Sequence, residues 1–174
     1  MQRIYELARA VRLAAFDVDG IMTDGRLYYS ERGEELKVFD VRDGHGLKML
    51  QESGVELALI TSRSSRAVAL RAENLGIGRV YQGAGNKLET FKALLAELRL
   101  EPGAASFMGD DLVDLPVMRR CGLSCTVPEA PQEVRDVAHY VTRAGGGRGA
   151  VREACELILR AQGNFDAQLR VHGS

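Results

Sequence analysis

The chain is short of cysteine, and the cysteines it has form no recognisable pattern. Cys121, Cys125 and Cys155 are an odd set with neither a C-x-x-C pair nor a nearby histidine cluster. A disulfide framework and a zinc site are therefore not expected. Such thiols favour a protein of the reducing cytoplasm.

Long apolar runs and surplus charge are also missing. No stretch approaches the roughly 20 uninterrupted apolar residues that cross a bilayer, and charged residues interrupt the N-terminus where a signal peptide needs its apolar run. Lys and Arg total 23 and Asp and Glu total 24, which gives a net charge of -1. Binding to nucleic acid through bulk charge is thus not expected. We predict neither a membrane nor a nucleic-acid partner.

What the chain does have is a regular alternation of short apolar runs with helical stretches, which is typical of a parallel sheet covered by helices. We predict an α/β fold with a doubly wound, Rossmann-like parallel sheet in a single domain, residues 1–162. The polar remainder, 163–174, is expected to be a flexible C-terminal tail. The predicted strands are 13–18, 55–61, 79–82, 105–109, 123–127 and a weaker 139–142, and the predicted helices are a short N-terminal one, 44–53, 65–75, 86–98, 112–120 and 150–161.

One segment, residues 25–39, breaks the alternation. Residues 26–30 and 34–39 resemble two strands joined by a glycine-containing turn, which predicts an inserted β-hairpin. An isolated hairpin is only marginally stable in water, so its apolar residues need cover from their own domain or from other subunits. The stretch from Asp24 to Thr61 is too short for a large cap domain.

Acidic residues follow two of the predicted central strands. Asp17 and Asp19 end the first strand on one side of it, and Asp110 and Asp111 follow another. Open α/β sheets bind ligands at this edge, and two like charges about 4 Å apart repel by about 4 kcal/mol at an effective dielectric near 20. The carboxylates therefore require a shared proton or a cation, and Mg²⁺ suits them. For Asp114 we favour a role at a helix N-terminus.

Two further residues lie where a strand passes into a helix. Alone, Thr61 is typical of a helix cap and Lys87 of a solvated surface lysine. Together with the acidic pairs they indicate a phosphate site. A hydroxyl can donate to a phosphoryl oxygen, and a lysine can neutralise the charge of an in-line displacement.

The order of these motifs resembles the haloacid dehalogenase superfamily of phosphotransferases. The matching residues are the D-V-D-G segment at 17–20, Thr61, Lys87 and the G-D-D segment at 109–111. Longer segments, among them F-D-V-D-G-I-M-T-D-G and E-E-L-K-V-F-D-V-R-D-G-H-G, are similar to the branch that hydrolyses an eight-carbon keto-sugar-acid phosphate in lipopolysaccharide synthesis. The chain has Thr61-Ser62-Arg63 where T-G-R is expected and Asn86-Lys87 where Asp-Lys is expected, and both departures keep the catalytic groups.

The resemblance implies a mechanism and a cofactor. Asp17 would be the nucleophile, and Asp19 would protonate the leaving oxygen and then activate water, with help from Thr61 and Lys87. One Mg²⁺ per subunit would be held by the metal ligands Asp17, Asp110 and the backbone carbonyl of Asp19, with Asp111 supporting them.

The same resemblance implies a substrate-binding set, because the leaving sugar is itself an acid that needs cations beyond Lys87. For Lys48 and Arg71, a solvated position on a helix face is about as plausible. The implied substrate-binding residues are Asp19, Asp40, Val41, Arg42, Asp43, Gly44, Lys48, Arg63, Arg71 and Lys87.

The family's assembly implies a homotetramer in which hairpins form a central barrel and neighbouring subunits help to cover each site. The tail 163–174 would then be a partial lid over an adjacent subunit. The glycine-rich loop 145–149 is either an anion cradle or, as we favour from its sequence, a strand-to-helix connector.

Three other interpretations stay open at this point. A phosphoacceptor signalling domain uses similar residues but needs an acceptor aspartate at the end of a middle strand, where this chain has Thr61 and Gln82. A catalytically silent scaffold of the same fold is disfavoured because the chain retains Asp17, Asp19, Lys87 and Asp110. A phosphatase for another keto-sugar-acid phosphate, of the nonulosonate 9-phosphate type, keeps the chemistry and changes the sugar.

Overall fold

The predicted parallel sheet is present in the computed structural model, which describes residues 2–172. Six strands lie in the order β5-β4-β1-β6-β7-β8, and every neighbouring pair is parallel. All six predicted strands are confirmed to within about two residues at each end, a normal uncertainty for such boundaries. The strands are β1 (Leu13–Phe16), β4 (Glu56–Ile60), β5 (Arg79–Tyr81), β6 (Ala105–Met108), β7 (Leu123–Thr126) and β8 (Tyr140–Val141).

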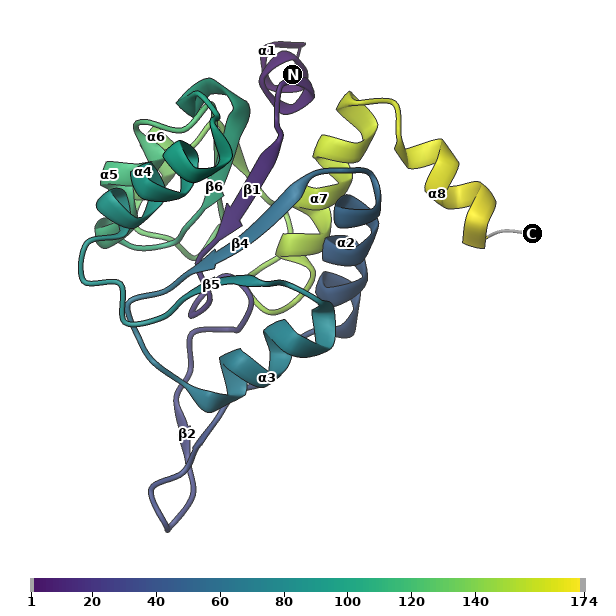
Figure 1. Ribbon diagram of the computed structural model, residues 1–174. Helices are drawn as coiled ribbons and strands as arrows, with labels where there is room; N and C mark the ends of the chain where they lie inside the picture. The colour runs from purple at the N-terminus through teal and green to yellow at the C-terminus, as the bar shows by residue number, and fades with distance from the viewer. Residues whose placement is uncertain (1, 173–174) are drawn as a thin grey trace.

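Helices cover both faces of this sheet (Figure 1). On one side α2 (Val41–Glu52) packs against α7 (Ala150–Ala161), which also contacts α1 (Gln2–Arg9). On the other side lie α4 (Lys87–Leu98), α5 (Leu115–Met118) and α6 (Gln132–Val137), while α3 (Arg66–Leu75) packs beside α2. The central strands β1, β4 and β6 are buried along nearly their whole length, as expected for parallel strands between two helical layers.

Several elements differ from the prediction. The helix expected over 112–120 is split into a 3-10 turn, η2 (Leu112–Asp114), and α5, because Pro116 in the first turn of α5 favours a new helix start. Helix α2 begins at Val41, three residues before the predicted start, with Asp40 as its N-cap. Helix α6 was not predicted.

The C-terminal segment also differs, since α8 (Phe165–His172) is a helix where the sequence suggested a frayed tail. The ring of Phe165 is buried and lies under the guanidinium of Arg160, 3.6 Å from the ring centroid, which anchors α8 to α7. Gly173 and Ser174, the last two residues of the predicted tail, lie outside the described residues. Among the residues described, no helix combines the length and the apolar content that a membrane span requires.

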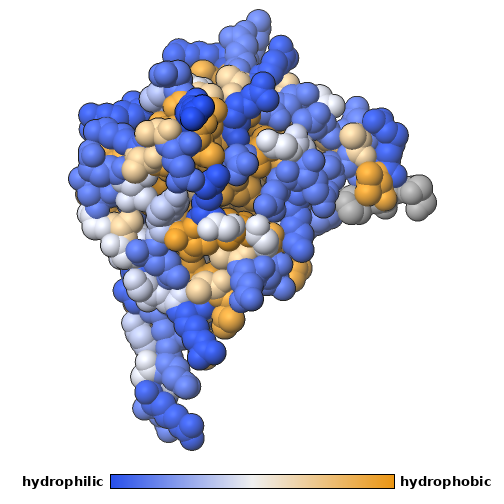
Figure 2. All heavy atoms as spheres, in the orientation of Figure 1, coloured by the Kyte–Doolittle hydropathy of each residue, from blue (hydrophilic) through white to orange (hydrophobic). Residues whose placement is uncertain are grey.

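The predicted hairpin forms and projects from the domain (Figure 1). Strands β2 (Tyr28–Tyr29) and β3 (Glu35–Leu36) pair antiparallel, and the described chain between β1 and α2 holds no large cap domain. In Figure 2 the projecting tip is hydrophilic. Behind the tip, however, Leu36 and Val38 are 58% and 65% exposed. The hairpin therefore leaves apolar side chains without cover in a single chain.

Close packing of α2 on α7 depends on small residues at the start of α2. A Cβ atom on Gly46 would lie 2.9 Å from Cα of Arg152, a backbone atom of α7. Next to it, Asp43 accepts hydrogen bonds from the backbone N–H groups of Arg152 (2.8 Å) and Gly149 (3.3 Å), and so caps the start of α7. Its carboxylate is thereby engaged inside the fold, which gives Asp43 a structural role, and the expected contact with substrate stays a prediction.

This contact predicts the effect of Gly46→Ala. Helix propensity alone favours Ala over Gly by about 1 kcal/mol, but the new methyl group would push against the Arg152 backbone, and overpacking of this kind costs about 1–3 kcal/mol. We expect a net loss of stability, measured as a lower midpoint of urea unfolding. Gly103→Ala is the matched control, since no atom lies within 4 Å of the added Cβ, and it should be neutral. Equal midpoints for the two variants would contradict the packing argument.

Candidate active site

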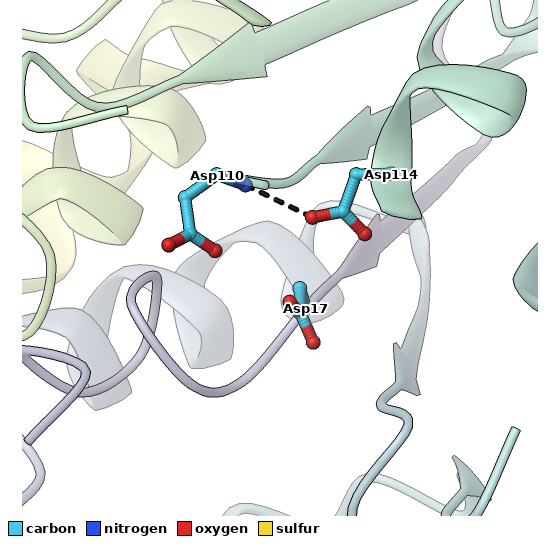
Figure 3. A group of neighbouring side chains, drawn as sticks. All are labelled: Asp17, Asp110 and Asp114. Carbon is cyan, nitrogen blue, oxygen red and sulfur yellow. Dashed lines mark hydrogen bonds between the residues drawn. The ribbon is translucent and has the colours of Figure 1, made fainter. Parts of the chain in front are cut away.

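Three carboxylates meet where β1 and β6 end (Figure 3). Asp17 follows β1 directly, whereas Asp110 and Asp114 come from the loop and the 3-10 turn after β6. One oxygen atom from each lies within 4.8 Å of the others. Charges this close repel by about 3 kcal/mol or more for each pair at an effective dielectric near 20. The cluster therefore needs positive charge.

Lys87 supplies part of that charge from the first turn of α4. Its Nζ lies 2.8 Å from Oδ2 of Asp17 and 2.7 Å from Oδ1 of Asp114, and its side chain is only 3% exposed. Burial alone would lower the pKa of Lys87, but the two carboxylates outweigh it and raise the pKa above its usual value. The side chain is thus a buried, fixed cation beside Asp17 and not a solvated surface lysine, and its action on a phosphoryl group stays a prediction.

One ammonium group does not neutralise three carboxylates. Burial, with the nearby charge of Asp114, raises the pKa of Asp17 to about 6 despite the contact with Lys87. Burial, followed by the charges of Asp17 and Asp114, raises the pKa of Asp110 to about 7. Near neutral pH the cluster therefore has a strong affinity for a proton or a cation.

The residues present fit a magnesium ion. Carboxylate oxygens are the hard ligands that Mg²⁺ prefers, and Oδ1 of Asp110 is buried without a hydrogen-bond partner. The nearby backbone is kept free of side chains, because a Cβ on Gly20, which has φ +89, would lie 2.0 Å from Oδ2 of Asp110. Asp110 thus presents an unused oxygen to the position where an ion would be shared with Asp17.

Asp114 is the functional residue for which the sequence interpretation was incomplete. It is fully buried, and its Oδ2 accepts hydrogen bonds from the backbone N–H groups of Asp110 (3.0 Å) and Asp111 (3.1 Å), while Oδ1 binds Lys87. Asp114 therefore orients the loop that carries Asp110 and holds Lys87 in place. The capping box that it forms with Asp111 is written in the sequence as D-x-x-D, which was the available signal.

Asp111 itself is exposed, and its Oδ1 accepts a hydrogen bond from the backbone N–H of Leu112 at 2.7 Å. It supports the cluster by ending the loop after β6 and starting η2. The prediction that Asp111 also supports the ligands of the metal ion stays a prediction.

A pocket of about 280 Å³ opens over this cluster. Thr61, buried at the end of β4, forms part of its wall together with Arg63 from the following loop. The predicted residues that the structure brings together in the pocket lining are Asp17, Asp19, Thr61, Arg63, Lys87, Asp110 and Asp111.

The other implied substrate-binding residues are not part of this lining. They lie at the N-cap of α2, along α2 and on α3: Asp40, Val41, Arg42, Asp43, Gly44, Lys48 and Arg71. Arg42 forms an ion pair with Asp40 at 2.8 Å, and Arg71 donates a hydrogen bond to the backbone carbonyl of Asp40 at 3.2 Å. Contact between these residues and a substrate stays a prediction, and within one chain they lie outside the pocket.

Lys37, at the base of the hairpin, was not predicted to belong to the site. Its ammonium group forms ion pairs with Asp19 and with Glu35, and its side chain is 1% exposed. The available signal was the alternation of charged Glu35 and Lys37 with apolar Leu36 and Val38, which places both charges on one face of the strand.

The glycine-rich loop 145–149 packs against the loop after β1. A Cβ on Gly146 would lie 1.8 Å from the carbonyl oxygen of Gly20, and the backbone N–H of Gly147 donates to the carbonyl of Ile21 at 2.9 Å. This packing supports the interpretation of the loop as a connector.

Comparison with known proteins agrees with the fold and the cluster. A family model described as haloacid dehalogenase-like hydrolase matches residues 75–151. The 3-deoxy-D-manno-octulosonate 8-phosphate phosphatase of Yersinia pestis is 47% identical over 163 residues, which cover 94% of this chain and 87% of that protein. The enzyme of the same name from Escherichia coli K12 is 48% identical over 159 residues, which cover 91% and 85%.

Solved structures extend the similarity to the whole fold. A probable YrbI family phosphatase from Pseudomonas syringae has a TM-score of 0.98 and 49% identity, covering 100% of this chain and 99% of that one. The 3-deoxy-D-manno-octulosonate 8-phosphate phosphatase of Moraxella catarrhalis, solved with magnesium, phosphate and the sugar acid, has a TM-score of 0.97 and 45% identity, covering 99% of each chain. With these matches over nearly its entire length, the chain belongs to the 3-deoxy-D-manno-octulosonate 8-phosphate phosphatase family of haloacid dehalogenase-like hydrolases.

Proposed function

We propose that the chain is a magnesium-dependent phosphomonoesterase that hydrolyses 3-deoxy-D-manno-octulosonate 8-phosphate to the free sugar acid and phosphate, in the cytoplasm and in lipopolysaccharide biosynthesis. One observation carries the proposal above all: the buried carboxylate of Asp17 lies at the floor of a pocket, with Lys87 at 2.8 Å and Asp110 beside it. Relatives that carry this activity by name match almost the whole chain.

Asp17 is positioned to act as the nucleophile. Its Oδ1 accepts a hydrogen bond from the backbone N–H of Val18 at 2.7 Å, and Oδ2 is held by Lys87, so the carboxylate cannot rotate freely. A carboxylate oxygen attacks phosphorus, the bond from phosphorus to the sugar oxygen breaks, and an aspartyl-phosphate forms. Asp19 gives its proton to the departing oxygen, so the sugar acid leaves as an alcohol.

The second half of the reaction reverses the role of Asp19. Its carboxylate takes a proton from water, the water oxygen attacks phosphorus, and the bond to Asp17 breaks to release phosphate. Lys87 neutralises charge on the phosphoryl oxygens, and the Thr61 hydroxyl donates a hydrogen bond to one of them. Asp17, Asp110 and the carbonyl of Asp19 would hold Mg²⁺, which supplies further positive charge for the phosphoryl oxygens.

A phosphate-release screen tests the substrate. We expect release from 3-deoxy-D-manno-octulosonate 8-phosphate to be faster than from a nonulosonate 9-phosphate or simple hexose phosphates, and to require Mg²⁺. Asp17→Asn should reduce release to background, because an amide cannot form the acyl phosphate, while circular dichroism and unfolding show an intact fold.

Asp24→Asn is the matched control in this screen, since Asp24 lies outside the carboxylate cluster and should retain activity. No phosphate release by the unaltered chain would indicate a silent scaffold. Preference for the nine-carbon ester would replace the named substrate, and substantial magnesium-dependent release by Asp17→Asn would refute the nucleophile.

Magnesium should also stabilise the fold. An ion that binds only the folded state at 100 times its dissociation constant adds about 2.7 kcal/mol, which is about 5–10 °C in Tm for a chain of this size. The gain should be larger at pH 8 than at pH 6, because Asp17 and Asp110, with pKa values of about 6 and about 7, must be deprotonated to bind the ion.

Asp110→Asn separates the two effects in the same thermal scan. Without metal it should raise Tm at pH 8, since it removes a carboxylate whose raised pKa shows that its charge is unfavourable in the fold. With metal it should show little further gain. A full magnesium response in this variant would exclude Asp110 as a ligand.

A single chain leaves the proposed site open, and we propose that a homotetramer formed through the hairpins completes it. The exposed apolar residues Leu36 and Val38 support this assembly. So does the position of Arg42, Lys48 and Arg71, which are outside the pocket lining of their own chain. The tail 163–174 is proposed as a partial lid over a neighbouring site.

Val38→Asp tests the assembly. A charge at this exposed position should not affect folding of the chain, but it should lower the mass measured by light scattering to that of a smaller species. Arg32→Asp, at the hydrophilic tip, is the matched control and should leave the mass unchanged. An unaltered chain that is monomeric, or a Val38→Asp variant with the original mass, would contradict a hairpin-mediated tetramer.

A further inference from the structure

The hairpin carries a charged face that reaches the proposed active site. Lys37 follows β3, and although the hairpin projects from the domain, the Lys37 side chain is 1% exposed. Its ammonium group lies between Oδ1 of Asp19 and Oε1 of Glu35, the latter at 3.1 Å. A lysine held this way is a poor candidate for a solvated surface charge.

These three residues form a closed ring with Arg63. Its guanidinium binds Oε2 of Glu35 at 2.5 Å, and its Nε lies 3.9 Å from Oδ2 of Asp19. Two cations and two carboxylates therefore alternate around the ring. The ring joins the hairpin to the loop after β1 and to the loop after β4, and Asp19 and Arg63 in these two loops line the pocket.

The two carboxylate oxygens of Asp19 differ in their hydrogen-bond partners. Oδ1 is bound by Lys37, whereas Oδ2 is buried and makes no hydrogen bond. Asp19 lines the same pocket as Asp17 and Lys87. One oxygen is thus anchored, whereas the other is buried with unused lone pairs beside Arg63, a residue of the pocket lining.

We propose that Lys37 is a positioning residue for proton delivery: by binding one oxygen of Asp19, it aims the other at the oxygen of the departing sugar. The inference rests on the proposed function, because it needs Asp19 as the acid. Glu35 holds Lys37 from the other side, so the hairpin takes part in the chemistry of its own subunit in addition to any role in assembly.

Dependence on the leaving group distinguishes positioning from simple support of the fold. An alkyl or sugar oxygen needs a proton as it leaves, whereas p-nitrophenolate leaves readily without one. The quantity to compare is kcat/KM, which covers the steps up to formation of the aspartyl-phosphate and excludes its hydrolysis. If the acid is misplaced, kcat/KM should therefore fall for the sugar phosphate and not for p-nitrophenyl phosphate.

We expect Lys37→Met to lower kcat/KM for the sugar phosphate by about 100-fold, the scale of a misplaced acid. The same variant should change kcat/KM for p-nitrophenyl phosphate by no more than about threefold, since that reaction needs little acid catalysis. Lys37→Arg should restore much of the sugar-phosphate rate. Lys92→Met, which removes only an exposed pair with Glu89, is the matched control and should leave both rates unchanged.

Glu35→Gln gives a second measurement if Lys37→Met does not fold, and it should show the same selectivity to a smaller extent. Equal losses for both substrates, or no loss, would overturn the positioning role while leaving the phosphatase function intact. An unaltered chain that hydrolyses p-nitrophenyl phosphate but no sugar phosphate would instead overturn the proposed function.

Discussion

Repulsion among the buried carboxylates at the ends of β1 and β6 is the constraint around which the rest of the site is built. Asp17, Asp110 and Asp114 lie too close together to be charged without compensation. Lys87 compensates in part, and burial, followed by the charges of the neighbouring carboxylates, keeps the pKa values of Asp17 and Asp110 raised. Because the fold keeps the carboxylates in this unfavourable arrangement, a divalent ion that binds there relieves the repulsion, and the ion in turn attracts a phosphoryl group.

The surrounding backbone holds the carboxylates where they repel. Gly20 and Gly109 leave no room for side chains of their own, since a Cβ on either would collide with Asp110 or Asp114. The N–H groups after β6 bind Asp114, and the N–H of Val18 binds Asp17. Positioning therefore comes from hydrogen bonds within rigid loops at strand ends, which is where open α/β sheets generate binding sites.

The sequence predicts the sheet and the core of the site because both depend on local patterns. Buried parallel strands are continuous apolar runs, and Asp17, Thr61, Lys87 and Asp110 each follow one of these runs or open the helix after it. The roles of Asp114 and Lys37 in the site were not predicted, for a different reason. Their roles depend on contacts between distant segments, Asp114 with Lys87 and Lys37 with Asp19, and a single sequence without the fold does not show such pairs. The helix α8 was missed because its apolar residues fall at every second position, which is not helical spacing, and its anchor, Phe165 under Arg160, is also a tertiary contact.

The hairpin reverses the usual arrangement of polar and apolar faces. Lys37 and Glu35 turn inward to Asp19 and Arg63, and Leu36 and Val38 turn outward to solvent. Since the period of a strand is two residues, the register that brings Lys37 to Asp19 necessarily exposes its apolar neighbours. A one-residue shift would cover the apolar side chains and remove the cation from Asp19. One strand register therefore has two consequences: it places Lys37 against the proposed acid, Asp19, and it exposes an apolar surface to another subunit. Burial of that outer surface in an assembly would also stabilise the inner contact.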